Sequence, residues 1–321
     1  MTPSLKLGFV MDPISQIILD KDTTFVLLLE AQARGHLNFY MELKDLYVRD
    51  GIPLADMAQV KVKRARDFYS LGERSTRPLA ELDAVLMRKD PPFTLDYIFA
   101  TYMLSLIPPK TFVINDPKGL REANEKMYIL NFPQAIPPTI VTKNIARAKS
   151  FLDEVGGEMI LKPLFGCGGY SVFYTYKDDK NLNALLELMT KEGTEFIMAQ
   201  KYLPEIREGD KRIIVLDGQP LGATLRVPKP DELRGNIHVG GECHKVELSE
   251  RDLFLCQSIS ARLRRDGLYF VGLDVIGDYI TEINVTSPTG IQEIDRLNDT
   301  CLEAQVIDFV EQKVAETRAG G

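Results

Sequence analysis

The first 115 residues alternate short apolar runs with segments of helical pattern, and this alternation narrows the possible folds more than any other feature. Strands are expected over residues 4–11, 38–43, 82–87 and 111–115, and a helix over 96–106. Thr23 or Thr24 could cap another helix, which runs through Ala33 and stops at Gly35. Strands that alternate with helices favour an α/β fold with a parallel sheet. Residues 50–78 are polar and irregular, and the sequence assigns no element to them.

Ligands of parallel sheets bind beyond the carboxyl ends of the strands. Asp12 and Arg88 follow the first and third expected strands and are therefore candidate binding residues. No GxGxxG motif follows the first strand, so a dinucleotide-binding domain of the usual kind is not indicated.

Residues 268–291 show the pattern of a β-hairpin. Two runs rich in β-branched and aromatic residues, 269–276 and 279–285, flank Gly277-Asp278. A three-residue loop would place Asp274 opposite Glu282, and Asn284 would share the face of Glu282 because side chains alternate along a strand. Facing carboxylates repel each other, and Mg²⁺ would relieve that repulsion. A two-residue loop would separate the carboxylates, and they would then belong to an ordinary solvated face.

The remainder of the chain continues with mixed elements. Helices are expected over residues 120–131, 145–155, 181–192, 250–265, 291–298 and 302–318, and strands over 139–142, 158–163 and 195–203. Residues 210–227 are expected to form two strands joined at Asp217-Gly218. The segment 228–243 is a long loop with several glycines, and such a loop is usually functional or disordered.

Composition excludes several classes of protein. A chain of 321 residues suggests two or three domains, and its net charge of −7 argues against a nucleic-acid partner. None of its four cysteines forms a CxxC pair, so they are expected to be free thiols in a reducing cytosol. The sequence shows neither a signal peptide nor an apolar run of membrane-spanning length.

Three groups of residues suggest phosphate and anion binding. Gly166, Gly168 and Gly169 follow a strand that carries Lys162, and glycines allow backbone N–H groups to approach phosphates. The spacing is not that of a P-loop, and a plain glycine-rich turn is the alternative. The segment 198–204 could meet an adenine edge or be an edge strand. Four arginines at strand ends or in the long loop either line an anionic pocket or lie on the surface: Arg88, Arg212, Arg226 and Arg234.

Together these motifs resemble the ATP-grasp superfamily and, more narrowly, the bacterial glutathione synthetases. The resemblance spans nearly the whole chain and is carried by VMDPI (10–14), LMRKDPPF (86–93), NEK (124–126), ILKPL (160–164), GCGG (166–169), MAQKYLP (198–204), GDKR (209–212), RGN (234–236), GLDVIGD (272–278) and TEINVTSPTGI (281–291). Phe165 and Cys167 depart from the acidic residue and methionine expected in the glycine loop, and Leu233 replaces a usual threonine.

The resemblance implies a three-domain ATP-grasp architecture: an N-terminal Rossmann-like domain (1–122), a small central domain (123–203) and a C-terminal domain (204–321) that carries a lid over 228–243. It implies ligation of γ-glutamylcysteine to glycine with ATP, through an acyl phosphate, to give glutathione, ADP and phosphate. It also implies one or two Mg²⁺ or Mn²⁺ ions, a cytoplasmic homotetramer, and neither a nucleic-acid nor a membrane partner.

The resemblance further implies roles for individual residues. The metal ligands would be Asp274, Glu282 and Asn284. The catalytic arginines would be Arg212, Arg226 and Arg234. The ATP-binding residues would be Lys126, Lys162, Gly166, Gly168, Gly169, Gln200, Lys201, Tyr202, Leu203, Asp210, Lys211, Arg212 and Asn236. The substrate-binding residues would be Asp12, Arg88, Arg226, Arg234, Asn284, Val285, Thr286 and Ser287.

Three other functions compete with this one. Another ATP-grasp amino-acid or peptide ligase would share the fold, although LMRKDPPF and INVTSPTGI argue against it. A nucleotide-binding regulatory protein would keep the fold without turnover, and the intact Asp274, Glu282 and Asn284 set argues against that. A small-molecule kinase would need no amine co-substrate, so an assay of ADP release with and without glycine would separate it.

Overall fold

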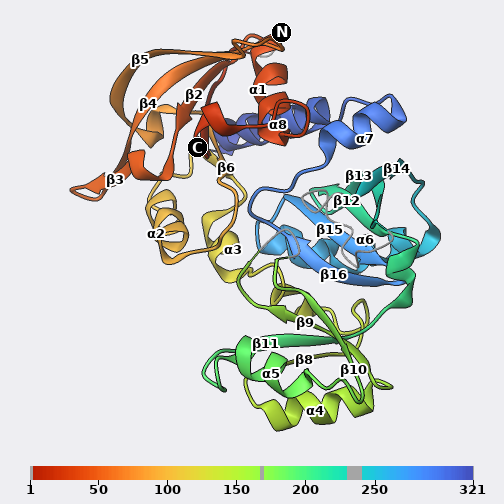
Figure 1. Ribbon diagram of the computed structural model, residues 1–321. Helices are drawn as coiled ribbons and strands as arrows, with labels where there is room; N and C mark the ends of the chain where they lie inside the picture. The colour runs from red at the N-terminus through yellow and green to blue at the C-terminus, as the bar shows by residue number, and fades with distance from the viewer. Residues whose placement is uncertain (1–2, 167–169, 230–240, 321) are drawn as a thin grey trace.

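A computed structural model describes residues 3–166, 170–229 and 241–320. The described chain forms three β-sheets with helices packed against them, and the sheets follow one another down the molecule (Figure 1). The α/β class expected from the sequence is confirmed. Short 3₁₀ turns also lie in the connections of the described chain: η1 (Ile14–Gln16), η2 (Leu43–Asp45), η3 (Leu79–Glu81) and η5 (Pro204–Arg207).

The N-terminal sheet has a parallel centre, as the alternation predicted. Strands β2 (Leu37–Met41), β1 (Lys6–Met11), β6 (Ala84–Arg88) and β7 (Phe112–Ile114) are adjacent and parallel. Helices α1 (Thr23–Ala33) and α2 (Leu95–Leu104) connect them, and each begins at a side-chain cap, Asp22 and Thr94 respectively. The carboxyl ends of β1 and β6 therefore lie side by side, which places Asp12 near Arg88.

The segment 50–78, to which the sequence assigned no element, extends this sheet. Strands β3 (Leu46–Arg49), β4 (Ile52–Val62) and β5 (Tyr69–Pro78) add to it in antiparallel fashion. Alternate residues of β4 are buried, including Ala55, Met57 and Val60, but β5 is almost wholly exposed and polar. Pairing with β4, rather than its own hydrophobic pattern, makes β5 a strand.

The expected helix over residues 120–131 is wrong. The structure has α3 (Pro117–Glu122) and the 3₁₀ turn η4 (Tyr128–Asn131), separated by a turn. The side-chain oxygen of Asn124 accepts from the N–H groups of Lys126 at 3.1 Å and Met127 at 3.0 Å. Asparagine competes with helical bonding in this way, so Lys126 lies in a turn rather than on a helix.

The central sheet is antiparallel, with strand order β10 (Phe173–Tyr176), β9 (Glu158–Pro163), β11 (Ile197–Lys201), β8 (Thr139–Thr142). Helices α4 (Ile145–Glu154) and α5 (Leu182–Thr190) pack against one face of it. Phe151, Leu161 and Leu186 belong to a hydrophobic core that is separate from the others.

The C-terminal sheet is also antiparallel, with strand order β14 (Glu242–Lys245), β13 (Gln219–Val227), β12 (Asp210–Leu216), β15 (Phe270–Ile276), β16 (Tyr279–Asn284). Helices α6 (Glu250–Arg265) and α7 (Ile291–Asn298) contact β13. The expected loop over 228–243 is too long at its end, because Glu242 and Cys243 belong to β14. Residues 230–240 lie outside the described residues.

The hairpin of β15 and β16 differs from expectation in its loop but not in its pairing. Only Gly277 and Asp278 separate the strands, so the expected three-residue loop is wrong. Asp274 nevertheless lies opposite Glu282, because Val275 pairs with Ile280 and Thr281 is an extra residue in β16. This β-bulge shifts the register by one residue and keeps both carboxylates on one face.

The last helix, α8 (Leu302–Gly320), returns to the N-terminal sheet. It lies beside α1 in Figure 1 and also contacts β7. One hydrophobic cluster contains Ile307 and Val310 of α8, Phe25 of α1 and Phe270 of β15. The two ends of the chain therefore share one core.

Candidate active site

A cavity of about 450 Å³ lies between the carboxyl ends of β1 and β6 and one face of the C-terminal sheet. The N-terminal sheet contributes Asp12 and Arg88, and the C-terminal sheet contributes Arg212, Arg226 and Asp274. Cations and anions thus meet in a space large enough for a small substrate.

Pairing across the C-terminal sheet creates a row of opposite charges. Asp210 lies opposite Arg226, and Arg212 lies opposite Asp274. Arg212 Nε donates to Asp274 Oδ1 at 2.6 Å, and Arg212 Nη2 donates to Asp274 Oδ2 at 3.2 Å. Arg226 Nη2 lies 2.9 Å from Asp274 Oδ1 and also donates to Asp210 Oδ2.

Charge and burial act in opposite directions on these carboxyl groups. Burial disfavours ionisation of Asp274, but Arg212 and Arg226 outweigh it and hold the pKa of Asp274 below its usual range. Burial raises the pKa of Asp210 despite the nearby Arg226. The arginines are thus fixed by carboxylates and are positioned for an anionic ligand in the cavity.

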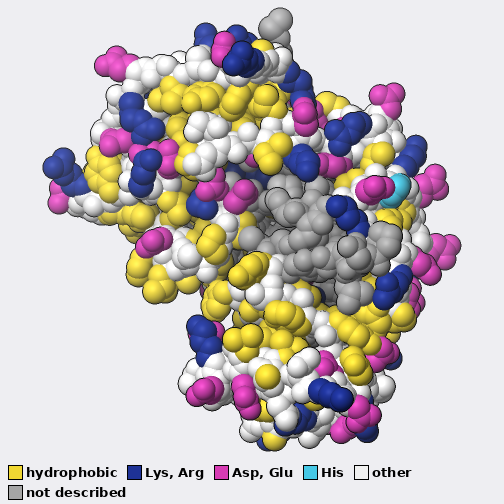
Figure 2. Space-filling model, viewed as in Figure 1, with side chains coloured by type: hydrophobic (Ala, Val, Ile, Leu, Met, Phe, Trp, Pro, Cys, Tyr) yellow, Lys and Arg dark blue, Asp and Glu magenta, His cyan; other side chains and the backbone are white. Residues whose placement is uncertain are grey.

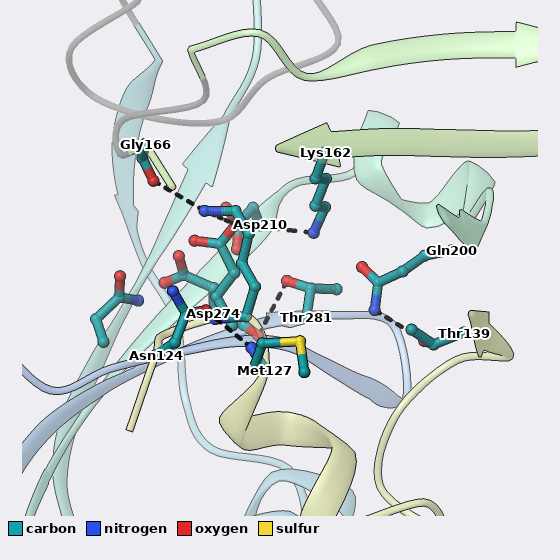
Figure 3. Close-up of polar contacts among 12 residues, drawn as sticks. Asn124, Met127, Thr139, Lys162, Gly166, Gln200, Asp210, Asp274 and Thr281 are labelled. Atoms are coloured by element: carbon teal, nitrogen blue, oxygen red, sulfur yellow. Dashed lines mark hydrogen bonds and ion pairs between the residues drawn. The ribbon is translucent and has the colours of Figure 1, made fainter. Parts of the chain in front are cut away.

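Glu282 faces the same space and is approached by two lysines. The Nζ atoms of Lys126 and Lys162 each lie 3.8 Å from Glu282 Oε1. Figure 3 shows Lys162 pointing from β9 towards the carboxylates of the C-terminal sheet. Lys126 Nζ donates to the carbonyl of Gly166 at 2.9 Å, and burial lowers the pKa of Lys162. Two lysines from separate segments therefore converge on one carboxylate.

The oxygen donors at this position suit a magnesium ion that is also bound by phosphates. Mg²⁺ usually takes one or two protein carboxylates and completes its shell with substrate oxygens and water. The side-chain carboxylate of Glu282 accepts no hydrogen bond among the described residues, whereas both carboxylate oxygens of Asp274 accept from arginine. The amide nitrogen of Asn284 donates to Gly272, which leaves its oxygen available. No group of three His, Cys, Asp or Glu side chains in the described chain could hold a metal unaided.

Of the expected substrate residues that the structure describes, all but one line the cavity. Arg88 is 4% exposed and donates from Nη2 to the carbonyl of Pro288 at 2.9 Å, while its Nη1 has no partner among described atoms. Asp12, Thr286 and Ser287 also face the cavity. Val285 is the exception, because its side chain is buried in the core and its carbonyl accepts from Asn115.

The expected ATP residues divide into several groups. Gln200 is buried at the end of β11 and donates to Thr139, as Figure 3 shows, and Leu203 is buried nearby. The Tyr202 ring packs edge-on against Tyr174 at 4.8 Å, and Lys201 is exposed. Gly168, Gly169, Arg234 and Asn236 lie outside the described residues.

Lys211 does not reach the cavity. Side chains alternate along β12, so Lys211 points to the face opposite that of Asp210 and Arg212. It pairs there with Asp252 in the first turn of α6. Among the expected ATP-binding residues, the side chain of Lys211 thus faces away from the carboxylates of Asp210 and Asp274.

Four acidic residues that line the cavity were missed by the sequence analysis: Asp22, Asp90, Glu125 and Glu293. Glu125 accepts from Thr286 at 3.2 Å, and burial together with the charge of Glu282 raises its pKa to about 7. Glu293 lies in the first turn of α7 and is 3% exposed. Glu125 adjoins Lys126 in the NEK motif, which was a usable signal, but nothing in the sequence distinguished Glu293.

Comparison with known proteins agrees with this arrangement. The model of the prokaryotic glutathione synthetase ATP-grasp domain matches residues 125–299, and that of the prokaryotic glutathione synthetase N-terminal domain matches residues 5–121. The chain belongs to the prokaryotic glutathione synthetase family. Most residues that face the cavity lie inside these two matched ranges.

Individual members of the prokaryotic glutathione synthetase family resemble the chain along nearly its whole length. A glutathione synthetase of Synechococcus elongatus is 46% identical over 97% of this chain and 99% of its own. One from Coxiella burnetii is 43% identical over 98% of both chains.

Solved structures support the ATP-grasp fold. The D-cycloserine synthetase DcsG aligns with a TM-score of 0.66 at 15% identity, covering 97% of this chain and 99% of its own. The macrocyclase MdnC of Microcystis aeruginosa aligns with a TM-score of 0.64 at 14% identity, covering 95% and 98%. At such identities the likeness concerns the fold alone.

The surface adds two observations. On the face shown in Figure 2, basic and acidic side chains are interspersed among the coloured residues without a large area of one sign. Within the described residues, the helices are too short or too polar to cross a membrane.

Proposed function

We propose that this chain joins γ-glutamylcysteine to glycine with ATP and releases glutathione, ADP and phosphate. ATP-dependent glutathione synthesis is the activity of the family to which the chain belongs. The observation that best supports the site is the convergence of Lys126, Lys162, Arg212 and Arg226 on carboxylates beside one cavity. ATP phosphates and a substrate carboxylate would find counter-charges there.

The reaction needs an activated carboxyl group, because a free carboxylate is a poor acyl donor. The cysteinyl carboxylate oxygen attacks the γ-phosphorus of ATP, and the bond to the ADP oxygen breaks. The glycine nitrogen then attacks the carbonyl carbon, the C–N bond forms, and phosphate leaves with the electron pair. Both steps depend on positioning and charge neutralisation more than on a protein nucleophile.

The buried cations divide this work between them. Lys126 and Lys162 would neutralise the ATP phosphates from the central-domain side of the site. Arg212 and Arg226, which Asp274 and Asp210 hold in place, would meet the transferred phosphoryl group. Arg88, at the other wall of the cavity, would hold a carboxylate of γ-glutamylcysteine through its unpartnered Nη1.

Asp274, Glu282 and Asn284 would hold one or two divalent ions, Mg²⁺ or Mn²⁺. A bound ion would neutralise part of the negative charge of the ATP phosphates. Gly166 and the segment from Gln200 to Leu203 would contribute to the rest of the ATP site.

The organisation of the whole protein is also part of the proposal. The domains would span residues 1–122, 123–203 and 204–321, with α8 of the last domain packed against the first. The chain would act in the cytoplasm as a homotetramer on small-molecule substrates.

A single assay tests the proposed reaction. Purified protein with MgATP and γ-glutamylcysteine is tested for ADP release and for glutathione, with and without glycine. We expect both products in equal amounts only when glycine is present. ADP release that never requires glycine would indicate a kinase, and no ADP release with any substrate would indicate a regulatory protein. ADP release with D-alanine or glutamate in place of γ-glutamylcysteine and glycine would indicate another ligase.

A further inference from the structure

Glu293 is a buried carboxylate for which the mechanism above has no use. It lies in the first turn of α7, and its side chain lines the cavity. The residue is 3% exposed, and Oε2 has no hydrogen-bond partner among the described residues. Leaving a buried carboxylate oxygen without a donor is costly, so such an atom in a cavity indicates a missing ligand.

Two other buried acids that line the cavity do have donors: Asp274 accepts from Arg212, and Glu125 accepts from Thr286. Asp210 Oδ1 also has no partner among the described residues, but Asp210 does not line the cavity and its Oδ2 accepts from Arg226. Burial raises the pKa of Glu293, although the charges of Arg296, Lys21 and Arg212 oppose this. These cations act on Glu293 at a distance and do not satisfy its oxygen. A cationic donor from a ligand would do so.

The position of Glu293 connects it to the reacting atoms. Residues 289–290, just before α7, pack against Arg212: Arg212 Nη1 donates to the carbonyl of Thr289 at 3.0 Å. Gly290 has a φ of +125°, which a residue with a side chain adopts only with strain, and a Cβ there would lie 3.3 Å from Arg212 Cγ. Arg212 in turn holds Asp274 beside the proposed phosphoryl site. Glu293 therefore lines the same cavity as Arg212 and Asp274, and it follows a segment that both Arg88 and Arg212 contact.

We infer that Glu293 binds the amino group of the incoming amino acid, glycine, and orients its nitrogen towards the acyl carbon. The inference rests on the proposed function, because it names the subsite for the second substrate. A primary ammonium group offers three donors and a positive charge, which suits a buried carboxylate lacking a donor. The ammonium gives one proton to this carboxylate, which leaves a neutral amine whose lone pair attacks the acyl carbon. The ammonium of the γ-glutamyl end is the competing ligand, and the KM values of the test separate the two.

The test compares two nucleophiles on the Glu293→Gln variant. Glycine carries an ammonium group at neutral pH, whereas hydroxylamine is largely uncharged and traps an acyl phosphate as a hydroxamate. We expect the apparent KM for glycine to rise roughly 10- to 100-fold, the range for loss of one charge-assisted hydrogen bond. The KM values for ATP and γ-glutamylcysteine, and the rate of hydroxamate formation, should stay at wild-type values.

A matched control and a second variant keep the test decisive. Glu303 of α8 also has an oxygen without a partner in the described chain, but it does not line the cavity, so Glu303→Gln should leave every KM unchanged. Glu293→Asp, which retains the charge, should recover part of the affinity for glycine. An unchanged KM for glycine in Glu293→Gln, or a rise confined to γ-glutamylcysteine, overturns the inference. Failure of the wild-type protein to form either glutathione or hydroxamate would refute the proposed function instead.

Discussion

Glu282 lies in the cavity and pairs only loosely with protein cations. The Nζ atoms of Lys126 and Lys162 each stand 3.8 Å from its Oε1. Replacing Glu282 with glutamine removes its negative charge but keeps its shape. We expect kcat to fall by about 10²–10³, as for loss of one electrostatic group in an active site. Stability should change little, because Glu282 accepts no close hydrogen bond in the described chain.

Steady-state assays at several Mg²⁺ concentrations would measure the effect of Glu282→Gln. Glu187→Gln, at an exposed position on α5, is the control for charge alone. Wild-type kcat in Glu282→Gln at ordinary Mg²⁺ would remove Glu282 from the metal site.

Glu125 makes the stability of the ligand-free protein depend on pH. Its folded pKa of about 7 lies above its ordinary value of 4.5, so the folded state keeps a proton that the unfolded state loses. The contribution of Glu125 to stability is therefore greatest below pH 4.5 and falls as the pH rises towards 7. The full loss is on the order of 3 kcal/mol, because each pH unit between the two pKa values contributes about 1.4 kcal/mol.

Glu125→Gln removes this titration. Urea unfolding at pH 5 and pH 8 should show the variant gaining on the wild type at the higher pH. Equal differences between variant and wild type at both pH values would mean that Glu125 does not titrate in this range.

Arg226 is 4% exposed and binds two buried carboxylates, Asp210 and Asp274. Arg226→Met would leave both with less compensation, at a cost of about 3–5 kcal/mol in the free energy of unfolding. Adding Asp210→Asn removes one of the unpaired charges, so the double variant should be more stable than Arg226→Met alone. Urea unfolding of the three proteins tests this order. A double variant that is less stable than Arg226→Met would show that the Asp210 charge is not the source of the cost.

At the scale of elements, the bulge in β16 decides which face carries the acids. Thr281 is the extra residue, and its hydroxyl donates to the carbonyl of Asp274 at 3.2 Å. Deleting Thr281 would turn Glu282 and Asn284 away from Asp274 and bring Ile283 to the cavity face. Ile283 is fully buried, so we expect loss of activity together with several kcal/mol of stability, in line with exposing or misplacing a core side chain.

Thr281→Ala is the matched control for the deletion, because it keeps the extra backbone residue and loses one hydrogen bond. Its activity should remain near wild type, with a cost of about 1 kcal/mol. If the deletion retains activity, the position of Glu282 does not depend on the bulge.

At the scale of the whole molecule, α8 links the last residues of the chain to the first sheet. Arg34, at the end of α1, lies 2.5 Å from Asp308 and 3.4 Å from Glu311 of α8, and Ile307 is fully buried in the shared core. Ile307→Ala should cost about 2–5 kcal/mol. The loss should affect the N-terminal and C-terminal sheets together, because both contribute to that core.

Urea unfolding of Ile307→Ala followed by hydrogen exchange would show which strands lose protection. Gln305→Ala, at an exposed position on α8, is the control and should stay within about 0.5 kcal/mol of the wild type. Loss of protection confined to α8 would mean that this helix is a separable appendage.

Local patterns carried much of the fold. The helices over 250–265 and 291–298 were predicted with the bounds that the structure shows, because capping residues and hydrophobic spacing act within one or two turns. The first helix ends at Ala33 as predicted, but its cap is Asp22 rather than Thr23 or Thr24. The motifs that resemble those of the bacterial glutathione synthetases also suggested a phosphate site. By contrast, β5 has no hydrophobic pattern of its own, and the turn at Asn124 interrupts a segment of helical composition.

What the sequence determined by itself was the set of local elements, the family and the kinds of side chain available for the chemistry. The tertiary structure decided which of those side chains face one cavity. Asp274 and Glu282 share a face through a bulge that no loop-length rule predicts, and Lys211 is excluded by strand alternation. Glu293 joins the cavity because α7 packs beside β13, although Arg88 of the same cavity lies far earlier in the chain. Such encounters depend on long-range packing, which short sequence patterns do not encode.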